Sequence, residues 1–153
     1  MGIHQIVIPL ATIATAVAGS LVTGANMAWY ATIGKPSWTP SGMVISLVWT
    51  TLFTLAAAAA LLAYEKTAGA TRRTVMSVFA FNAALNAGWS WIFFGFHQIG
   101  WAVAEALLLG SSVAALIVLL RRPAPLAAWL LSPYLAWTLF AAYLNYIVWS
   151  LNT

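Results

Sequence analysis

Polar side chains and large aromatic rings share helical faces in three apolar stretches of the sequence. Asn82, Asn86 and Trp89 lie at i, i+4 and i+7, which places them on one side of a helix. Two other stretches repeat this pattern with Ser46, Trp49 and Phe53, and with Tyr134, Trp137, Ala141 and Asn145. Aromatic walls with a few polar groups are typical of a site for a flat apolar ligand. A buried amide must find a hydrogen-bond partner, so contacts between helices are the alternative, favoured for Asn82 taken alone.

Glu105 is the one carboxylate well inside an apolar stretch. An ionisable group at membrane depth is costly and indicates a functional site by default. A small proton-coupled transporter that uses Glu105 is therefore one alternative function, although no inverted repeat is visible. Glu105 also lies only about two helical turns from His97, roughly 10 Å at 1.5 Å per residue. A structural role near the membrane interface is equally consistent with that position.

Several other kinds of site are excluded by the residues that the chain contains. The sequence has no cysteine, which rules out disulfides and thiolate metal sites. His4 and His97 are far apart and have no ligand spacing around them, so we expect no metal site. No nucleophile–base pair and no glycine-rich phosphate loop is present. The net charge of +4 is small and scattered, and it indicates no nucleic-acid partner.

Composition identifies the solvent in which these residues must be positioned. Of the 153 residues, 63% are hydrophobic and only 5% are charged, whereas about a quarter are charged in soluble domains. Membrane lipid is the environment that fits such a surface. Five apolar runs are long enough to cross a bilayer as helices, and they cover residues 5–27, 43–64, 74–96, 99–120 and 126–151. The sequence therefore predicts an all-α integral membrane protein, a single bundle of five transmembrane helices over residues 1–153.

The longest break in this apolar pattern is the segment 28–42. Pro36 and Pro40 prevent a regular helix from running through it. Trp38 and Tyr30 are more than a solvated linker needs, so we expect a structured first loop that acts as a lid over the bundle. The alternative is an aromatic belt at headgroup level.

The charges predict the orientation of the bundle. All but one of the basic residues fall on the side of the N-terminus, namely Lys66, Arg72, Arg73, Arg121 and Arg122. Lys35, in the lid, is on the other side. The positive-inside rule then puts the N-terminus in the cytoplasm.

Small residues recur every fourth position in two of the predicted spans. They are Ala102, Ala106, Gly110 and Ala114 in one, and Ala80, Ala84 and Gly88 in the other. Such faces let helices approach closely in lipid. We expect one to serve the bundle and the other a homodimer.

Several of these segments, taken together, resemble one family. Trp29-Tyr30 with Gly34-Lys35-Pro36-Ser37-Trp38-Thr39-Pro40 is similar to the first loop of the TspO/translocator protein family, also called tryptophan-rich sensory proteins or peripheral benzodiazepine receptors. Its later segments are matched by Val48–Phe53, Asn86–Gly95, Ser132–Trp137 and Ala142–Tyr146. The resemblance runs in order from Trp29 to Leu151.

The resemblance implies a pocket near the first loop that takes protoporphyrin IX, haem or drug-like molecules, with no obligatory cofactor. Carried over by position, the pocket residues are Tyr30, Trp38, Trp49, Asn86, Ser90, Trp137 and Ala141, to which the shared faces add Phe53 and Asn145. The role implied is sensory, regulatory or transport. Some members are reported to degrade protoporphyrin IX in light, which makes Trp49 and Trp137 the candidate catalytic residues, because indole can donate an electron.

Two further expectations follow from comparing the chain with the family. Cholesterol or another sterol is a ligand of some members, but the sterol motif needs a basic residue after Leu144-Asn145-Tyr146, and none follows here. Sterol or lipid binding therefore stays an alternative without support from that motif. The short termini without an organelle-type presequence predict a member in a bacterial envelope membrane.

Overall fold

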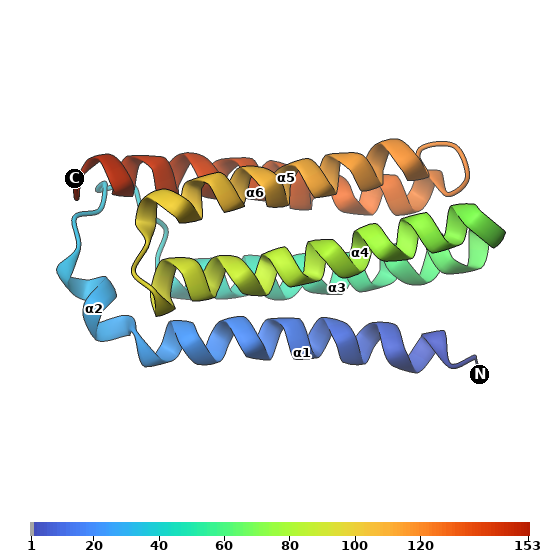
Figure 1. Ribbon diagram of the computed structural model, residues 1–153, viewed down its shortest axis with the longest axis horizontal. Coiled ribbons are helices and arrows are strands. Elements are labelled where there is room, and N and C mark those ends of the chain that lie inside the picture. The colour runs from blue at the N-terminus through green and yellow to red at the C-terminus, as the bar shows by residue number, and fades with distance from the viewer. Residues whose placement is uncertain (1) are drawn as a thin grey trace.

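The computed structural model describes residues 2–153, and every regular element in that range is helical. The elements are α1 (His4–Ala25), α2 (Met27–Thr32), α3 (Gly42–Lys66), α4 (Gly69–Ser90), the π-helical turn η1 (Trp91–Gly95), α5 (Ile99–Leu120) and α6 (Pro125–Ser150). The long helices lie side by side along one direction, and the two ends of the chain are at opposite ends of the bundle (Figure 1). The prediction of an all-α bundle is confirmed.

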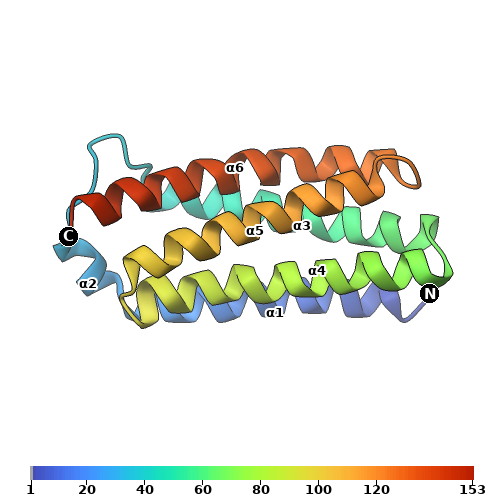
Figure 2. The same ribbon diagram turned by 45° about the horizontal axis from the view of Figure 1, so that its top comes forward.

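Four of the helices are long and apolar enough to cross a membrane: α1, α3, α5 and α6. The remaining predicted span, 74–96, corresponds to α4 followed by η1, and α4 does not meet the same criterion of apolarity. α4 has two arginines in its first turns, and further along it carries the buried amide of Asn82 and the half-buried amide of Asn86. It nevertheless lies within the bundle, in contact with α1 on one side and α5 on the other (Figure 2).

Helix ends agree with the predicted spans to within a few residues, except at the start of α4. The predicted span 99–120 coincides with α5, whereas α4 begins at Gly69 rather than at residue 74. Arg72 explains the difference, because its side chain donates to the carbonyl oxygen of Thr67 and its guanidinium lies 4.3 Å from the centre of the Tyr64 ring. The helix therefore starts outside the apolar run that hydropathy detects.

The segment 28–42 is structured, as expected, but it is partly helical. α1 ends at Ala25, and the chain restarts as α2 before an extended stretch reaches α3, whose first turn is capped by Ser41. The Nζ of Lys35 donates to the carbonyl oxygens of Tyr30, at 2.5 Å, and of Ile33, at 2.8 Å. We call residues 27–41 the lid; it lies at the end of the bundle that holds the C-terminus (Figure 2).

The two small-residue faces have different surroundings. Ala102, Ala106 and Gly110 of α5 are buried, and a Cβ built on Gly110 would lie 3.6 Å from Oγ1 of Thr138 on α6. This face serves the contact between α5 and α6. The corresponding residues of α4, Ala80 and Ala84, lie on the outer surface of the chain.

Candidate functional site

A cavity of about 480 Å³ lies beneath the lid, and all five long helices and η1 contribute to its lining. Its size falls in the range of cavities that hold small molecules. Eight of the nine predicted ligand-binding residues line it: Tyr30, Trp49, Phe53, Asn86, Ser90, Trp137, Ala141 and Asn145. The fold therefore brings together residues that are more than a hundred positions apart in the sequence.

Trp38 is the predicted site residue that does not line this cavity. Its ring stacks on Tyr143 with the centroids 6.0 Å apart and the planes 10° apart, and it also contacts Phe140. At these contacts the lid crosses the C-terminal half of α6, and Trp38 is 45% exposed. From the lid and α2, the cavity is instead lined by Pro40, Tyr30 and Met27.

The sequence pattern missed the contribution of α1. Thr15, Ala16, Gly19, Ser20 and Thr23 all line the cavity. They are small or hydroxylated, so α1 provides room for a ligand rather than aromatic walls. A Cβ built on Gly19 would lie 3.0 Å from Oγ of Ser90, which shows how closely α1 approaches α4. The repeat of small and hydroxylated residues at helical spacing in α1 is the signal that could have identified them.

A chain of hydrogen bonds joins α4, α5 and α6 beside the cavity. Nδ2 of Asn86 donates to the Tyr134 hydroxyl over 2.9 Å, and that hydroxyl donates to Oδ1 of Asn82 over 3.1 Å. Nδ2 of Asn82 in turn donates to Oγ of Ser112 on α5, at 2.8 Å. Asn82 thus makes the interhelical hydrogen bonds that were expected for it, one to α5 and one to α6. Asn86 differs because it also borders the cavity.

Asn145 lines the cavity, but its amide is already used for structure. Oδ1 accepts a hydrogen bond from Nε1 of Trp89, at 3.0 Å, and Nδ2 donates to the carbonyl oxygen of Ile99, also at 3.0 Å. Ile99 is the first residue of α5. Asn145 therefore holds the end of α4 and the start of α5 against α6, and it positions the cavity wall.

The two candidate catalytic tryptophans provide aromatic surfaces on facing helices. On α3, the Trp49 ring contacts Phe53 at 5.7 Å and Tyr134 edge-on at 6.1 Å between centroids. On α6, the Trp137 ring packs on Phe140 at 5.1 Å. The Nε1 of Trp137 is buried and has no hydrogen-bond partner among residues 2–153. A buried donor without a partner costs free energy, and because the atom is buried, the Trp137 side chain offers its ring rather than this N–H to the cavity.

Tyr30 closes the cavity at the lid. Its ring lies 5.4 Å from that of Phe94, and the Lys35 ammonium is 4.5 Å from its centre. Burial raises the pKa of the Tyr30 phenol, so its hydroxyl stays protonated at neutral pH and able to donate.

Charged and metal-binding groups contribute nothing to the lining of this cavity. Within residues 2–153, no three His, Cys, Asp or Glu side chains gather in a way that could hold a metal ion. Glu105 lies outside the cavity lining, in a separate groove between η1 and α5. The cavity can therefore bind through shape, aromatic contact and a few neutral hydrogen-bonding groups.

Comparison with known proteins agrees with this architecture. Residues 6–150 match the model of the TspO/MBR family. The chain is 39% identical over 138 residues to the Translocator protein of Homo sapiens, which covers 89% of this chain and 82% of that protein. It is 35% identical over 144 residues to the Tryptophan-rich protein TspO of Chlorobaculum tepidum, covering 92% and 90%. It is 34% identical over 124 residues to the Tryptophan-rich protein TspO of Bacillus cereus, covering 81% and 80%. This chain is a membrane protein that belongs to the TspO/MBR family.

Proposed function

We propose that the cavity under the lid binds a flat apolar ligand of the tetrapyrrole class, protoporphyrin IX or haem, for a sensory, regulatory or transport role. The observation that carries this proposal is the lining of the cavity, in which the rings of Trp49, Phe53 and Trp137 and a few neutral polar side chains surround a space of about 480 Å³. A porphyrin offers a large flat apolar surface together with carboxylate acceptors. Trp49 and Trp137 would contact the ring, while Asn86, Ser90 and Tyr30 supply the neutral polar groups that orient it.

The test is a titration of the purified protein with protoporphyrin IX in the dark, followed by quenching of tryptophan fluorescence. We expect saturable binding that weakens by roughly tenfold in Trp137→Phe, because the smaller ring loses part of the aromatic contact area with the ligand. Trp129→Phe is the matched control, since Trp129 lies on the same helix but is 75% exposed and outside the cavity. Equal affinities in both variants, or no saturable quenching at all, would contradict the proposal.

Light-dependent degradation of the porphyrin is a separate part of the proposal. The cavity contains no acid–base pair, so any chemistry would use the reactivity of the excited ligand with dioxygen. Trp49 and Trp137 would act as electron donors beside it. Under illumination in air, porphyrin absorbance should fall faster with the wild type than with Trp49→Phe at matched occupancy. Equal bleaching rates would leave a binding protein without this activity.

The two alternative functions receive less support from the geometry. Proton-coupled transport through Glu105 would require that carboxyl to face the transported molecule, and it does not line the cavity. Sterol binding is not supported by the sterol motif, because no basic residue follows Tyr146.

We further propose a membrane arrangement for the chain. α4 with η1 is a fifth span, shielded by α1 and α5, and the N-terminus lies on the cytoplasmic side of a bacterial envelope membrane.

A homodimer through the outward face of α4 is consistent with exposed Ala80 and Ala84. Ala84→Phe should then shift the particle mass in detergent from dimer to monomer. Ala115→Phe, on the exposed side of α5, is the control. A wild type that is already monomeric, or an unchanged dimer in Ala84→Phe, would exclude this interface.

A further inference from the structure

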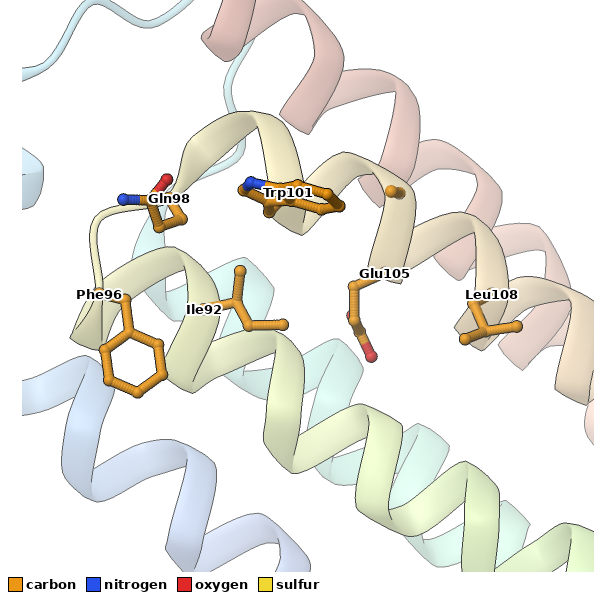
Figure 3. Close-up of a pocket in the computed structure, with 7 residues that line it drawn as sticks. Ile92, Phe96, Gln98, Trp101, Glu105 and Leu108 are labelled. Atoms are coloured by element: carbon orange, nitrogen blue, oxygen red, sulfur yellow. The ribbon is translucent and has the colours of Figure 1, made fainter.

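A second hollow lies on the outside of the bundle, between η1 and the first half of α5. This groove has a volume of about 390 Å³ and is lined by Ile92, Phe96, Trp101, Glu105 and Leu108, with Gln98 at its end (Figure 3). It shares no lining residue with the cavity under the lid. Trp101 is 71% exposed and Phe96 64% exposed, so the groove opens towards lipid. A molecule that occupies it must come from the bilayer.

The groove contains a single ionisable group, the carboxyl of Glu105. This side chain extends from α5 into the space between α5 and the neighbouring turn that holds Ile92 (Figure 3). Both of its oxygens are buried, and neither has a hydrogen-bond partner among residues 2–153. A carboxyl group without a partner in an apolar site is costly, because neither lipid nor the surrounding apolar side chains replace the water that it loses.

The chemistry of this groove selects a particular class of ligand. Apart from Gln98 at its end, its other walls are hydrocarbon and aromatic, which suit an alkyl or ring system. An amine pairs with a carboxyl in either protonation state: it accepts a hydrogen bond from COOH, or as ammonium it donates to COO⁻. These two descriptions differ only in the position of one proton. A neutral acid and a neutral amine therefore form a pair with no net charge, and binding brings no net charge into the bilayer.

The aromatic side chains strengthen the case for an amine over an alcohol. Trp101 and Phe96 line a groove that already holds the acid, and a cation over the face of such a ring gains further attraction. An alcohol would gain only one ordinary hydrogen bond. Glu105 is only partly buried, so rotation about its own side-chain bonds can turn the carboxyl towards the open groove.

We propose that the groove between η1 and α5 is a binding site for a lipophilic amine from the bilayer. The nitrogen pairs with Glu105, and the hydrocarbon lies along Ile92, Leu108 and Trp101. This site is independent of the cavity under the lid.

The test is equilibrium binding of radiolabelled dodecylamine to the full chain in nanodiscs, with empty nanodiscs as the baseline. We expect saturable binding of about one molecule per chain, weakened roughly tenfold or more in Glu105→Gln, which keeps the shape but cannot form the ion pair. Glu65→Gln is the matched control, because Glu65 is the only other acidic residue of the sequence. It lies at the C-terminal end of α3, which we propose to be the cytoplasmic end. This variant should bind as the wild type does.

A second variant keeps the test valid if Glu105→Gln perturbs the fold. Ala104→Trp places a large ring in the groove while Glu105 itself is kept, and it should also abolish saturable binding. Porphyrin quenching should be unchanged in both variants, which separates a failure here from a failure of the proposed function. The proposal is overturned if Glu105→Gln binds dodecylamine as tightly as the wild type, which would mean partition into lipid only. It is also overturned if dodecan-1-ol binds as tightly as the amine.

Discussion

Tyr134 joins two helices through one hydroxyl group, and its removal should be costly. The hydroxyl accepts from Asn86 and donates to Asn82, and the residue is only 4% exposed. Tyr134→Phe would leave an amide N–H and an amide oxygen without partners in an apolar interior. We expect a loss of about 1–3 kcal/mol in the free energy of unfolding, seen as a lower midpoint of thermal unfolding in detergent.

Tyr143→Phe is the control for this prediction. Tyr143 is on the same helix, is 57% exposed and lies outside the Asn82–Tyr134–Asn86 chain of hydrogen bonds. The same loss of one hydroxyl should then have little effect. If both variants unfold at the same temperature, the hydrogen bonds to Tyr134 contribute nothing measurable to stability.

At the scale of single residues, sequence periodicity predicted the lining of α3, α4 and α6 but not the placement of Trp38. A helix repeats every 3.6 residues, so Trp49 and Phe53 share a face whatever the rest of the chain does. Trp38 belongs to an extended segment with no such repeat. Its position depends on which rings it meets across the bundle, here Phe140 and Tyr143, and this is tertiary information.

Helix α5 approaches α6 closely where Gly100 faces Trp149. A Cβ on Gly100 would lie 2.9 Å from Nε1 and 3.1 Å from Cε2 of the indole, which is too close for the ring to stay in place. Gly100→Ala should therefore push the start of α5 away from the end of α6. We expect a loss of about 1–3 kcal/mol in unfolding free energy, measured as a shift in thermal midpoint.

Gly88→Ala is the matched substitution on α4, where a Cβ would meet nothing within 4 Å. Alanine is the better helix former by about 1 kcal/mol, so this variant should be neutral or slightly stabilised. A comparable loss at both positions would mean that the effect comes from the glycine backbone and not from the contact with Trp149.

Asn152, which lies just beyond the end of α6, holds the lid through two hydrogen bonds to Gly34. Asn152 accepts a hydrogen bond from the Gly34 N–H at 2.8 Å and donates to the Gly34 carbonyl oxygen at 2.9 Å. Asn152→Ala should release this contact and increase hydrogen exchange at the Gly34 amide by roughly five- to thirtyfold, as expected for a loss of one to two kcal/mol.

Asn152→Asp separates the two halves of this contact. It keeps an acceptor for the Gly34 N–H but loses the donor to the carbonyl oxygen, so its exchange rate should fall between those of the wild type and Asn152→Ala. Porphyrin release from the cavity should accelerate in the same order. Exchange at Gly34 that is identical in all three proteins would show that the lid is held by other contacts.

At the scale of elements, hydropathy located the helices well because lipid selects long apolar runs. It could not detect α2, a helix of six residues inside the predicted lid. It also set the start of α4 too late, because arginines near a helix end are compatible with helix but score as non-membrane. Hydropathy also could not predict the contact between Gly34 and Asn152, because it joins positions 118 residues apart. The position of Trp38 could not be predicted for the same reason.

The whole molecule has a strong asymmetry of charge between its two ends. The connections at one end carry Lys66, Arg72, Arg73, Arg121 and Arg122, while the lid end carries Lys35. Moving several arginines across a bilayer is much costlier than moving one lysine, which is the physical content of the positive-inside rule. The lid should therefore face away from the cytoplasm, so that ligands reach the cavity from the outer side or from the outer leaflet.

Because the chain has no cysteine, single-cysteine variants can measure this orientation directly. Ser37 in the lid and Thr71 beside the arginines of α4 are both exposed. In spheroplasts treated with a membrane-impermeant maleimide, Ser37→Cys should be labelled at once and Thr71→Cys only after lysis. The reverse pattern would mean that the lid opens to the cytoplasm, and the cavity would then take its ligand from inside the cell. Labelling of both variants in intact spheroplasts would mean that the chain inserts in two orientations, so that the charge asymmetry is too weak to select one of them.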